Sequence, residues 1–311
     1  MVTGVIGAGH LGYHHARILG ELTGGTVPVF DTDGERMRTL ASELDVRPCT
    51  GLESMLEECD SVVVATSTST HHQVVMKALD AGVHVLVEKP IASSAAEGRE
   101  MVLKAEDSNL VLAVGHVERF NPAIMAASEL IENPLFIEGH RMAPFNPRGT
   151  DVSVVLDLMI HDIDLVLSFV RSQVASVQAS GMPVLSGNVD IASARIQFEN
   201  GCVVNMTASR ISRERIRKLR FFQPRMYVAV DFAAREVEAY RLQGDSIMPV
   251  TVEVPDSDAL TEELRDFRNA CSTGGAPVVS GREGLNALIS AQIISGRINE
   301  AVENLMGRPT E

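Results

Sequence analysis

A glycine-rich segment near the N-terminus constrains the fold of this chain more than any other feature. The apolar stretch Val2–Ile6 predicts a short buried strand, GAGHLG follows it at once, and Tyr13–Leu19 predicts a helix. The pattern G-x-G-x-x-G between a strand and a helix is typical of dinucleotide-binding βαβ units. Its first glycine allows a tight turn, the second lets a pyrophosphate approach the backbone, and the third lets the helix pack on the strand. The pattern therefore predicts a phosphate-binding turn at the start of a parallel sheet.

An aspartate at the end of the next strand indicates which dinucleotide is bound. Val27–Phe30 predicts a second strand, and Asp31 follows it at about the 20-residue spacing where an acidic side chain meets the ribose 2′-hydroxyl. Asp31 and Asp33 would repel the 2′-phosphate of NADP, while Arg36 is a nearby cation. We therefore predict NAD rather than NADP as the cofactor.

Strands and helices continue to alternate through the first part of the chain. Further strands are expected near Val46 and at Ser61–Ala65, Val83–Val87 and Leu110–Gly115, with helices between them. Such alternation is typical of an α/β fold with a doubly wound parallel sheet, the Rossmann architecture. We place this dinucleotide-binding domain at residues 1–121.

The strand within VHVLVEKP ends in a charged pair. Its apolar run stops abruptly at Glu88 and Lys89, and Pro90 fixes the exit of the chain because proline cannot continue a central strand. The carboxyl ends of parallel strands are where open α/β sheets bind ligands. The alternative is an ordinary surface lysine after a strand. Lys89 is thus a candidate for the functional site.

Hydroxyl and imidazole side chains follow the fourth predicted strand. The run Thr66–Thr70 carries hydroxyls that can cap the next helix and bind the ribose or phosphate of the cofactor. His71 and His72 are expected at the start of that helix, facing the cleft or solvent. His14 and His15 are expected on the surface of the first helix.

Length and charge limit the remaining possibilities. At 311 residues the chain exceeds the usual single-domain size, so we expect a second domain, residues 122–311, for substrate binding and oligomerisation. The net charge of −14 argues against a nucleic-acid or anionic-membrane surface. Four cysteines without metal-ligand spacing or a dense disulfide pattern indicate a reducing cytoplasm. We expect neither a signal segment nor a membrane span, because no apolar run approaches the ~20 residues that a span needs.

The second half contains one constellation suited to proton transfer. The stretch Val152–Val170 has helical character, and Asp157 and His161 lie four residues apart on one helix face. A carboxylate near an imidazole can orient its tautomer and raise its basicity. The alternative, which the residues alone favour, is a polar stripe on an amphipathic helix. A metal site with Asp162 and Asp164 is not expected, because no second histidine or cysteine stands at suitable spacing.

Strands dominate beyond this helix, and two features of them are notable. Asn200-Gly201 predicts a hairpin with a two-residue type I′ turn. Six cations occur in the eleven residues from Arg210 to Arg220. A solvated sheet edge is the default interpretation of this run. The alternative is a groove for an anionic substrate such as a nucleotide diphosphate.

Together these motifs resemble those of the Gfo/Idh/MocA oxidoreductases. GAGHLG, the Thr/Ser-rich strand end, VHVLVEKP and VGHVERFNPA carry the resemblance, which covers essentially the whole chain. It implies an N-terminal dinucleotide-binding domain and an α+β C-terminal domain with a large, mostly antiparallel sheet, whose last helix returns to the first domain. Members move hydride between nicotinamide and a sugar or polyol carbon. GTDVSVVLDLMIHDID, which lacks the glycine pair of many members, looks together with HVERFNPA most like the subgroup that oxidises UDP-N-acetylglucosamine at C3.

The resemblance also implies roles for individual residues. His161 would take the proton from the reacting hydroxyl, Lys89 would stabilise the oxygen, and Asp157 would orient His161. Since Lys89 precedes the proposed domain boundary and the other two follow it, we expect the site where the domains meet. The residues expected to bind cofactor are Gly7, Gly9, His10, Leu11, Gly12, Asp31, Thr66, Ser67, Thr68, His71, Glu88 and Lys89. Those considered for substrate are Arg119, Arg141 and Arg148.

Three matters stay open on the sequence. The substrate is a small molecule, by our best interpretation a nucleotide sugar, and an inositol or free-sugar dehydrogenase is the alternative. A catalytically inert nucleotide-sensing regulator is the alternative of another class, although retention of the whole trio weighs against it. A sheet with helices on one face only predicts a homodimer or homotetramer.

Overall fold

The computed structural model describes residues 1–146 and 152–306. The chain divides into two compact units, each built from two stretches of sequence. Among the described helices, none combines the length and the apolarity that crossing a membrane requires. The first unit comprises Met1–Phe120 and Asp258–Leu288, and the second comprises Asn121–Ser257 and the chain from Ile289 onward.

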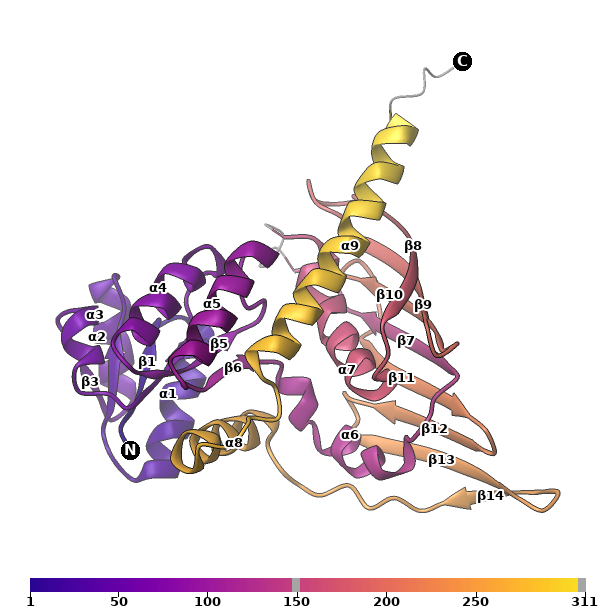
Figure 1. The fold of residues 1–311 in the computed structure, drawn as a ribbon, viewed down its shortest axis with the longest axis horizontal. Coiled ribbons are helices and arrows are strands. Elements are labelled where there is room, and N and C mark those ends of the chain that lie inside the picture. The colour runs from indigo at the N-terminus through magenta and orange to yellow at the C-terminus, as the bar shows by residue number, and fades with distance from the viewer. Residues whose placement is uncertain (147–151, 307–311) are drawn as a thin grey trace. The chain divides into compact units, whose positions relative to one another are not determined.

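In the described residues, the first unit is built on a six-stranded parallel sheet of order β3-β2-β1-β4-β5-β6 (Figure 1). The interior strands are almost wholly apolar because helices cover both faces of a doubly wound sheet. The strand order reverses between β1 and β4, and ligands bind at such switch points. This confirms the predicted fold class. The strands are β1 (Thr3–Ile6), β2 (Val27–Phe30), β3 (Val46–Pro48), β4 (Ser61–Val64), β5 (His84–Glu88) and β6 (Leu112–Gly115).

The helices of this unit begin at well-defined caps. Asp33 and Asp258 accept backbone N–H groups at the starts of α2 and α8, and Ser94 forms a capping box with Glu97 in α5. Figure 1 shows α8, in gold, beside α1, to which it packs although the two are far apart in sequence. The helices are α1 (His10–Thr23), α2 (Gly34–Glu43), α3 (Leu52–Leu56), α4 (Thr68–Asp80), α5 (Ala95–Asp107), η1 (Val117–Phe120), α8 (Ala259–Thr273) and the start of α9 (Gly281–Met306).

Within its described part, the second unit holds an eight-stranded sheet of order β14-β13-β12-β11-β7-β10-β9-β8. Neighbouring strands run antiparallel except β7 and β10, which are parallel, as the partners Phe136↔Val203 and Met142↔Ser209 show. The mostly antiparallel second sheet is therefore confirmed. The strands are β7 (Phe136–Met142), β8 (Val174–Met182), β9 (Ile191–Phe198), β10 (Val203–Ser209), β11 (Ile216–Gln223), β12 (Met226–Asp231), β13 (Glu236–Gln243) and β14 (Ser246–Val250).

One face of this sheet forms the core of the unit. Along β9, Ala194, Ile196 and Phe198 are buried while Arg195 and Gln197 between them are exposed, as the two-residue period of a half-buried strand requires. Helix α7 lies against β7 (Figure 1). The helices are α6 (Pro122–Ala127), η2 (Ser128–Leu130), η3 (Val155–Met159), α7 (Ile160–Val170) and the rest of α9.

Two expectations for these strands are wrong. The cation run enters β11, which pairs with β7 on one side and β12 on the other, so it is not a sheet edge. The hairpin after β9 is not type I′, because of its residues only Gly201, with φ 89°, has a positive φ in the described backbone. Phe198 N donates to Cys202 O at 2.9 Å, which leaves a three-residue loop that ends in a left-handed glycine.

Candidate functional site

Each glycine of the first turn is required for a separate reason. Gly7 has φ +108°, and a Cβ there would lie 2.6 Å from Ala65 O. A Cβ on Gly12 would overlap Gly7 O, so the helix approaches the turn only because position 12 is glycine. Around Gly9 no described atom lies within 4 Å of where a Cβ would be. The turn thus leaves open space at the position where a pyrophosphate approaches the backbone.

The start of α1 is suited to an anion. Gly9 is the N-cap residue, and among the described residues no side-chain hydrogen bond caps the helix there. The N–H groups of the first turn of a helix have no partner within the helix, and together with the helix dipole they attract negative charge. The glycine turn and this helix start therefore fit a dinucleotide pyrophosphate.

A cleft of about 750 Å³ opens beside this turn, at the switch point of the sheet. Its floor comes from the turn after β1 and the ends of β2 and β4. The predicted cofactor residues that line it are Gly7, Gly9, His10, Leu11, Asp31, Thr66 and Ser67. The predicted residues Gly12, Thr68, His71, Glu88 and Lys89 are not among its lining.

The sequence did not predict one wall of the cleft. This wall comes from the start of α3 and the outer face of α4, where Lys77 Nζ lies 2.8 Å from Glu53 Oε1. Neither segment carries a recognised motif, and the weak signal is the short β3 followed by a Thr-Gly turn. The lining residues that were missed include Thr50, Gly51, Leu52, Glu53, Gln73, Val74 and Lys77.

Asp31 links the end of β2 to the glycine turn. Its Oδ2 accepts the N–H of Ala8 at 2.6 Å, and its Oδ1 accepts the N–H of Asp33 at 2.8 Å. A carboxylate has about four lone-pair sites, so each oxygen keeps room for a ribose hydroxyl. Asp31 is therefore fixed in the cleft as a negatively charged acceptor, which fits the ribose of NAD.

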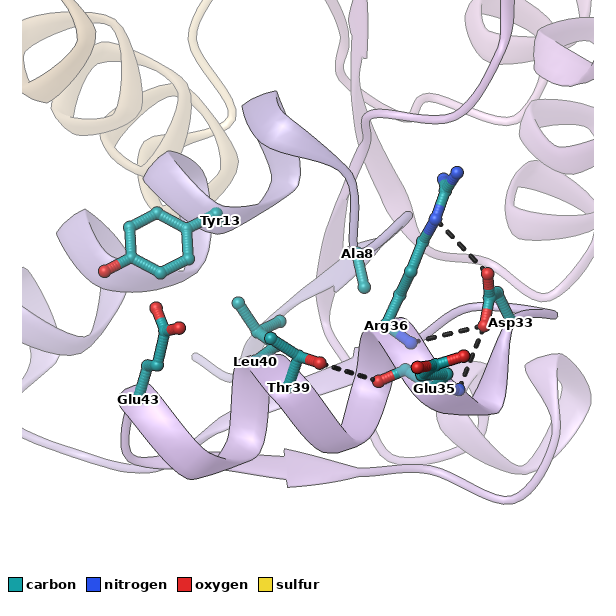
Figure 2. Close-up of a pocket in the computed structure, with 8 residues that line it drawn as sticks. All are labelled: Ala8, Tyr13, Asp33, Glu35, Arg36, Thr39, Leu40 and Glu43. Carbon is teal, nitrogen blue, oxygen red and sulfur yellow. Dashed lines mark hydrogen bonds and ion pairs between the residues drawn. The ribbon is translucent and has the colours of Figure 1, made fainter.

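A second pocket, of about 320 Å³, lies between α1 and α2 (Figure 2). Tyr13 and Glu43 stand on one side of it, and Asp33 and Arg36 on the other. Arg36 lines both this pocket and the cofactor cleft. Its Nε lies 3.3 Å from Asp33 Oδ2, so this arginine beside the cleft is paired with an acid.

His71 is placed differently from our expectation. It faces neither cleft nor solvent: it is 1% exposed, with Nε2 3.1 Å from Thr66 O and Nδ1 3.0 Å from Pro90 O. Burial lowers the pKa of His71, and its hydrogen bonds to the two carbonyls oppose that shift. The imidazole thus joins the loop after β4 to the loop after β5.

A buried histidine pairs with the glutamate at the end of β5. Glu88 is buried, and its Oε1 lies 2.8 Å from Nε2 of His15. His15 is fully buried, so its expected place on the helix surface is wrong. Lys89 is half-buried, and its backbone N–H donates to Glu88 Oε2 at 3.3 Å. A Cβ on Gly115 would lie 3.0 Å from the same oxygen, so the carboxylate packs closely against this glycine.

The helix that carries the predicted D-x-x-x-H pair does not begin as an α-helix. Asp157 lies in a π-helical turn, η3, and His161 lies in the first turn of α7. Both side chains are half-buried. A π-turn inserts an extra residue into the helical repeat, so the α-helical spacing that we assumed for the pair does not apply there. Such turns occur often at functional sites.

The arginines considered for substrate lie in three situations. Arg141 is 2% exposed, and its Nε and Nη2 lie 3.0 and 2.7 Å from Asp162 Oδ1, so it anchors α7 to β7. Arg119 Nη2 lies 3.1 Å from Glu283 Oε1 within the first unit. Arg148 lies outside the described residues.

The run of cations after β10 is largely engaged with nearby oxygens. Arg210 is buried and donates to Val152 O at 2.7 Å. Lys218 pairs with Asp231 at 2.9 Å, and Arg220 pairs with Glu138 at 3.0 Å. The exposed arginines of the run are Arg213 and Arg215, in the connection between β10 and β11. In the described residues, no cluster of three or more His, Cys, Asp or Glu is placed to hold a metal ion.

Known proteins share both parts of this architecture. Residues 1–116 match the model of an oxidoreductase family with an NAD-binding Rossmann fold, and residues 133–230 match a GFO/IDH/MocA C-terminal domain. The chain is 36% identical to the UDP-N-acetylglucosamine 3-dehydrogenase of Acidithiobacillus ferrooxidans, with 99% of each chain covered. A solved structure of an enzyme of that name from the same organism has a TM-score of 0.92, with 96% of this chain and 98% of that chain covered at 36% identity.

More distant relatives act on other hydroxyl compounds. The scyllo-inositol 2-dehydrogenase (NAD(+)) of Bacillus subtilis is 29% identical, with 67% of each chain covered. A levoglucosan dehydrogenase in complex with NADH has a TM-score of 0.88 at 18% identity, covering 96% of this chain and 97% of that chain, which shows a shared fold. The two domain matches and the full-length relative together show that the chain belongs to the Gfo/Idh/MocA family of NAD-binding oxidoreductases.

Proposed function

We propose that this protein oxidises the C3 hydroxyl of UDP-N-acetylglucosamine, with NAD as the hydride acceptor. The observation that carries the proposal is the similarity to an enzyme of that name over 99% of both chains. The trio Lys89, Asp157 and His161 stands at the motif positions that such a reaction needs. An inositol dehydrogenase is the second candidate, because relatives with that name match two thirds or more of the chain.

The proposed roles follow from the chemistry of alcohol oxidation. NAD, when bound, accepts the hydride from the carbon that bears the hydroxyl. His161 takes the hydroxyl proton as general base, and the oxygen then becomes a carbonyl oxygen. Lys89 stabilises the negative charge that develops on this oxygen. Asp157 keeps the imidazole of His161 in the orientation and tautomer that accept a proton.

The test is a substrate panel with NAD. The purified protein is given UDP-N-acetylglucosamine, free N-acetylglucosamine, UDP-glucose or myo-inositol, and NADH formation is followed by absorbance. Because a 3-keto sugar is short-lived, the product is trapped by borodeuteride, and the position of deuterium is read by mass spectrometry. We expect turnover with the UDP-N-acetylhexosamine and deuterium at C3. Turnover with myo-inositol alone would replace the first candidate by the second.

The proposal includes assembly into a homo-oligomer through the outer face of the second sheet. Ring neighbours cross this face from strand to strand: Phe136 to Phe222 at 5.6 Å, Phe222 to Tyr227 at 5.2 Å, and Tyr227 to Tyr240 at 6.3 Å between centroids. Their sequence neighbours toward the core, such as Val228, are fully buried, so the aromatic row faces away from the core.

A second copy of the chain is the occupant that we propose for this face. The row is flanked by ion pairs that lie across the strands, Arg220–Glu138 and Lys218–Asp231, so little net charge opposes self-association. Light scattering should therefore give at least twice the mass of one chain at micromolar concentration. Tyr227→Arg should lower that mass, while Tyr13→Arg, on the first unit, should not.

A further inference from the structure

Helix α8 carries an acidic residue at a core position. Its buried residues are Glu263, Leu264, Phe267 and Ala270, so the carboxylate stands on the side that faces the core. Glu263 is 2% exposed, and neither of its oxygens has a hydrogen-bond partner among the described residues. Burial of an ionised carboxylate without a partner is strongly unfavourable, so this place favours the protonated, uncharged acid.

A second buried acid, Glu88, is bonded to His15 of α1, the helix that packs on α8, and its charge acts on Glu263. Glu88 differs because it has donors: Nε2 of His15 at 2.8 Å and the N–H of Lys89 at 3.3 Å. Burial raises the pKa of Glu88, but the bond to His15 and the positive charge of Lys89 bring it below its ordinary value. Glu88 is therefore ionised at neutral pH.

The surroundings of Glu263 shift its pKa in the direction opposite to that of Glu88. Burial, the charge of Glu88 and then that of Asp266 raise its pKa well above the ordinary value. The elements packed around Glu263 also carry His15 on α1, and Glu118 and Arg119 on η1. The pKa values of these two carboxyls are thus shifted in opposite directions, a pattern typical of groups with distinct roles.

The ionised member of the pair borders Lys89 directly. The backbone of Lys89 is held on both sides, by the Glu88 carboxylate through its own N–H and by His71 through the carbonyl of Pro90. A second negative charge beside Glu88 would raise the free energy of the ionised Glu88 carboxylate and would repel it from its place between His15 and the N–H of Lys89.

We propose that Glu263 is a positioning residue that acts as an uncharged acid. While Glu263 stays protonated, it places no second negative charge beside Glu88, and the His15–Glu88 pair can hold the backbone that presents Lys89. This inference rests on the proposed function, because it takes Lys89 to be catalytic. It assigns a role to α8, which lies far from the glycine turn and from the EKP segment in sequence. When Glu263 ionises at high pH, the His15–Glu88 pair no longer fixes the backbone of Lys89.

The first experiment measures the pH profile of turnover. Glu263→Gln keeps the shape of the neutral acid and cannot ionise, and Glu262→Gln is the matched control, because Glu262 is its neighbour on α8 but pairs with Arg265. We expect the wild-type kcat to fall at alkaline pH and Glu263→Gln to remove that fall, with kcat at pH 7 changed by less than about two-fold. The control should keep the wild-type profile. If Glu263 only fills space in the core, Glu263→Gln will show the same pH profile of kcat as the wild type.

The second experiment measures stability and needs no substrate. Because the folded-state pKa of Glu263 is raised, the folded protein binds one more proton than the unfolded chain above the ordinary glutamate pKa of about 4.3, and this lowers stability as pH rises. Glu263→Gln should therefore melt at a higher temperature than wild type at pH 8 and show no gain at pH 4. The gain should shrink when Glu88→Gln is also present, since the charge of Glu88 contributes to the shift.

A third readout observes the proton itself. The infrared carbonyl stretch of a protonated carboxyl should be present at pH 8 in the wild type and in Glu262→Gln, and absent in Glu263→Gln. If Lys89→Ala keeps full turnover, the proposed function fails, whatever the other readouts give. If Lys89→Ala loses turnover but Glu263→Gln leaves the pH profile as it was, the positioning role is wrong. If the wild type shows no protonated-carboxyl stretch at pH 8 and Glu263→Gln gives no gain in stability there, the acid is ionised and the inference is overturned.

Discussion

Asp33 pairs with Arg36 at the start of α2, and Arg36 also lines the cofactor cleft. Asp33 Oδ2 lies 3.3 Å from Arg36 Nε, and its Oδ1 accepts the N–H groups of Glu35 and Arg36 at 2.9 and 3.2 Å. A helix start and an arginine are the two donors that best hold a phosphate, and here a carboxylate of the chain engages both (Figure 2). A 2′-phosphate would meet this charge and that of Asp31 beside it.

This arrangement predicts which residue excludes NADP. Asp33→Ser keeps an N-cap oxygen but removes the charge, and so releases Arg36 for a phosphate. We expect NADP affinity to rise by at least about ten-fold, or about 1.4 kcal/mol, with NAD affinity little changed. Calorimetric titration of both dinucleotides measures this. Adding Arg36→Ala should cancel the gain, and Asp31→Ala should instead weaken NAD. Wild-type protein that binds NADP more tightly than NAD would contradict the whole assignment.

Single replacements of the trio should separate chemistry from cofactor binding. His161→Ala removes the proposed general base and should lower kcat by about 10²–10⁴-fold. Lys89→Ala should lower it comparably, and Asp157→Asn should have a smaller effect and shift the pH profile. NAD affinity in His161→Ala, measured by titration, should stay at the wild-type value. If Lys89 and His161 act on one step, their double variant should lose less than the product of the single losses. Full turnover in His161→Ala would remove it from the mechanism.

The buried pair Arg141–Asp162 should contribute strongly to stability. Arg141→Met leaves the Asp162 carboxylate, about 4% exposed, without the guanidinium that binds it. Such a loss costs about 3–5 kcal/mol, which urea unfolding would detect. The double variant Arg141→Met with Asp162→Leu replaces both charges by apolar groups and should recover much of the loss. If Arg141 instead contacts substrate, Arg141→Met should raise KM while the unfolding midpoint stays unchanged.

Asp190 should make the second unit sensitive to acid. Its Oδ2 accepts the N–H groups of Val184, Leu185 and Ser186 at 2.6–2.8 Å. Burial opposes ionisation, but the hydroxyl of Ser186 and these three N–H groups leave the pKa of Asp190 below its ordinary value. A lowered folded-state pKa gives stability that is present above pH ~3.9 and is lost as pH falls further.

The variant Asp190→Asn tests that dependence. It should lower the free energy of unfolding by about 1.5–3 kcal/mol at pH 7, which is the contribution of a hydrogen bond to a charged group. The difference in unfolding free energy between this variant and the wild type, measured by urea unfolding, should become smaller below pH 4. A constant difference from pH 7 to pH 3 would mean that the charge of Asp190 contributes nothing.

The sequence predicted the features that depend only on residues near one another in the chain. The glycine turn, Asp31 and the buried strand before Lys89 follow from backbone sterics and from burial on both faces of a parallel sheet. The place of His15 does not follow, because its partner Glu88 is 73 positions away in sequence. A histidine on an amphipathic helix is equally compatible with solvent, so its burial becomes evident only from the tertiary structure.

The remaining differences have the same origin. Glu263 was not singled out, because an acid within an amphipathic helix resembles any surface residue until the elements packed on it are known. The π-turn at Asp157 was not predicted, because π-helices are rare and occur mostly as single turns inside α-helices, which no sequence motif marks. The cations of β11 were assigned to an edge, since strand order in an antiparallel sheet depends on pairings that no single segment encodes.

The parallel pairing of β7 with β10 sets the order in which this unit can be assembled. Parallel strands need a crossover, and here η3, α7, β8 and β9 all lie between the two partners. At a synthesis rate of about 5–20 residues per second, several seconds separate the emergence of Met142 from that of Val203. During that interval neither strand that pairs with β7 has emerged, because β10 begins at Val203 and β11 follows it, and the helix with Asp157 and His161 has only part of its sheet to pack on. This helix and the centre of the sheet are therefore completed late and together, so a nascent chain that stops before β10 carries Asp157 and His161 without the surface that places them.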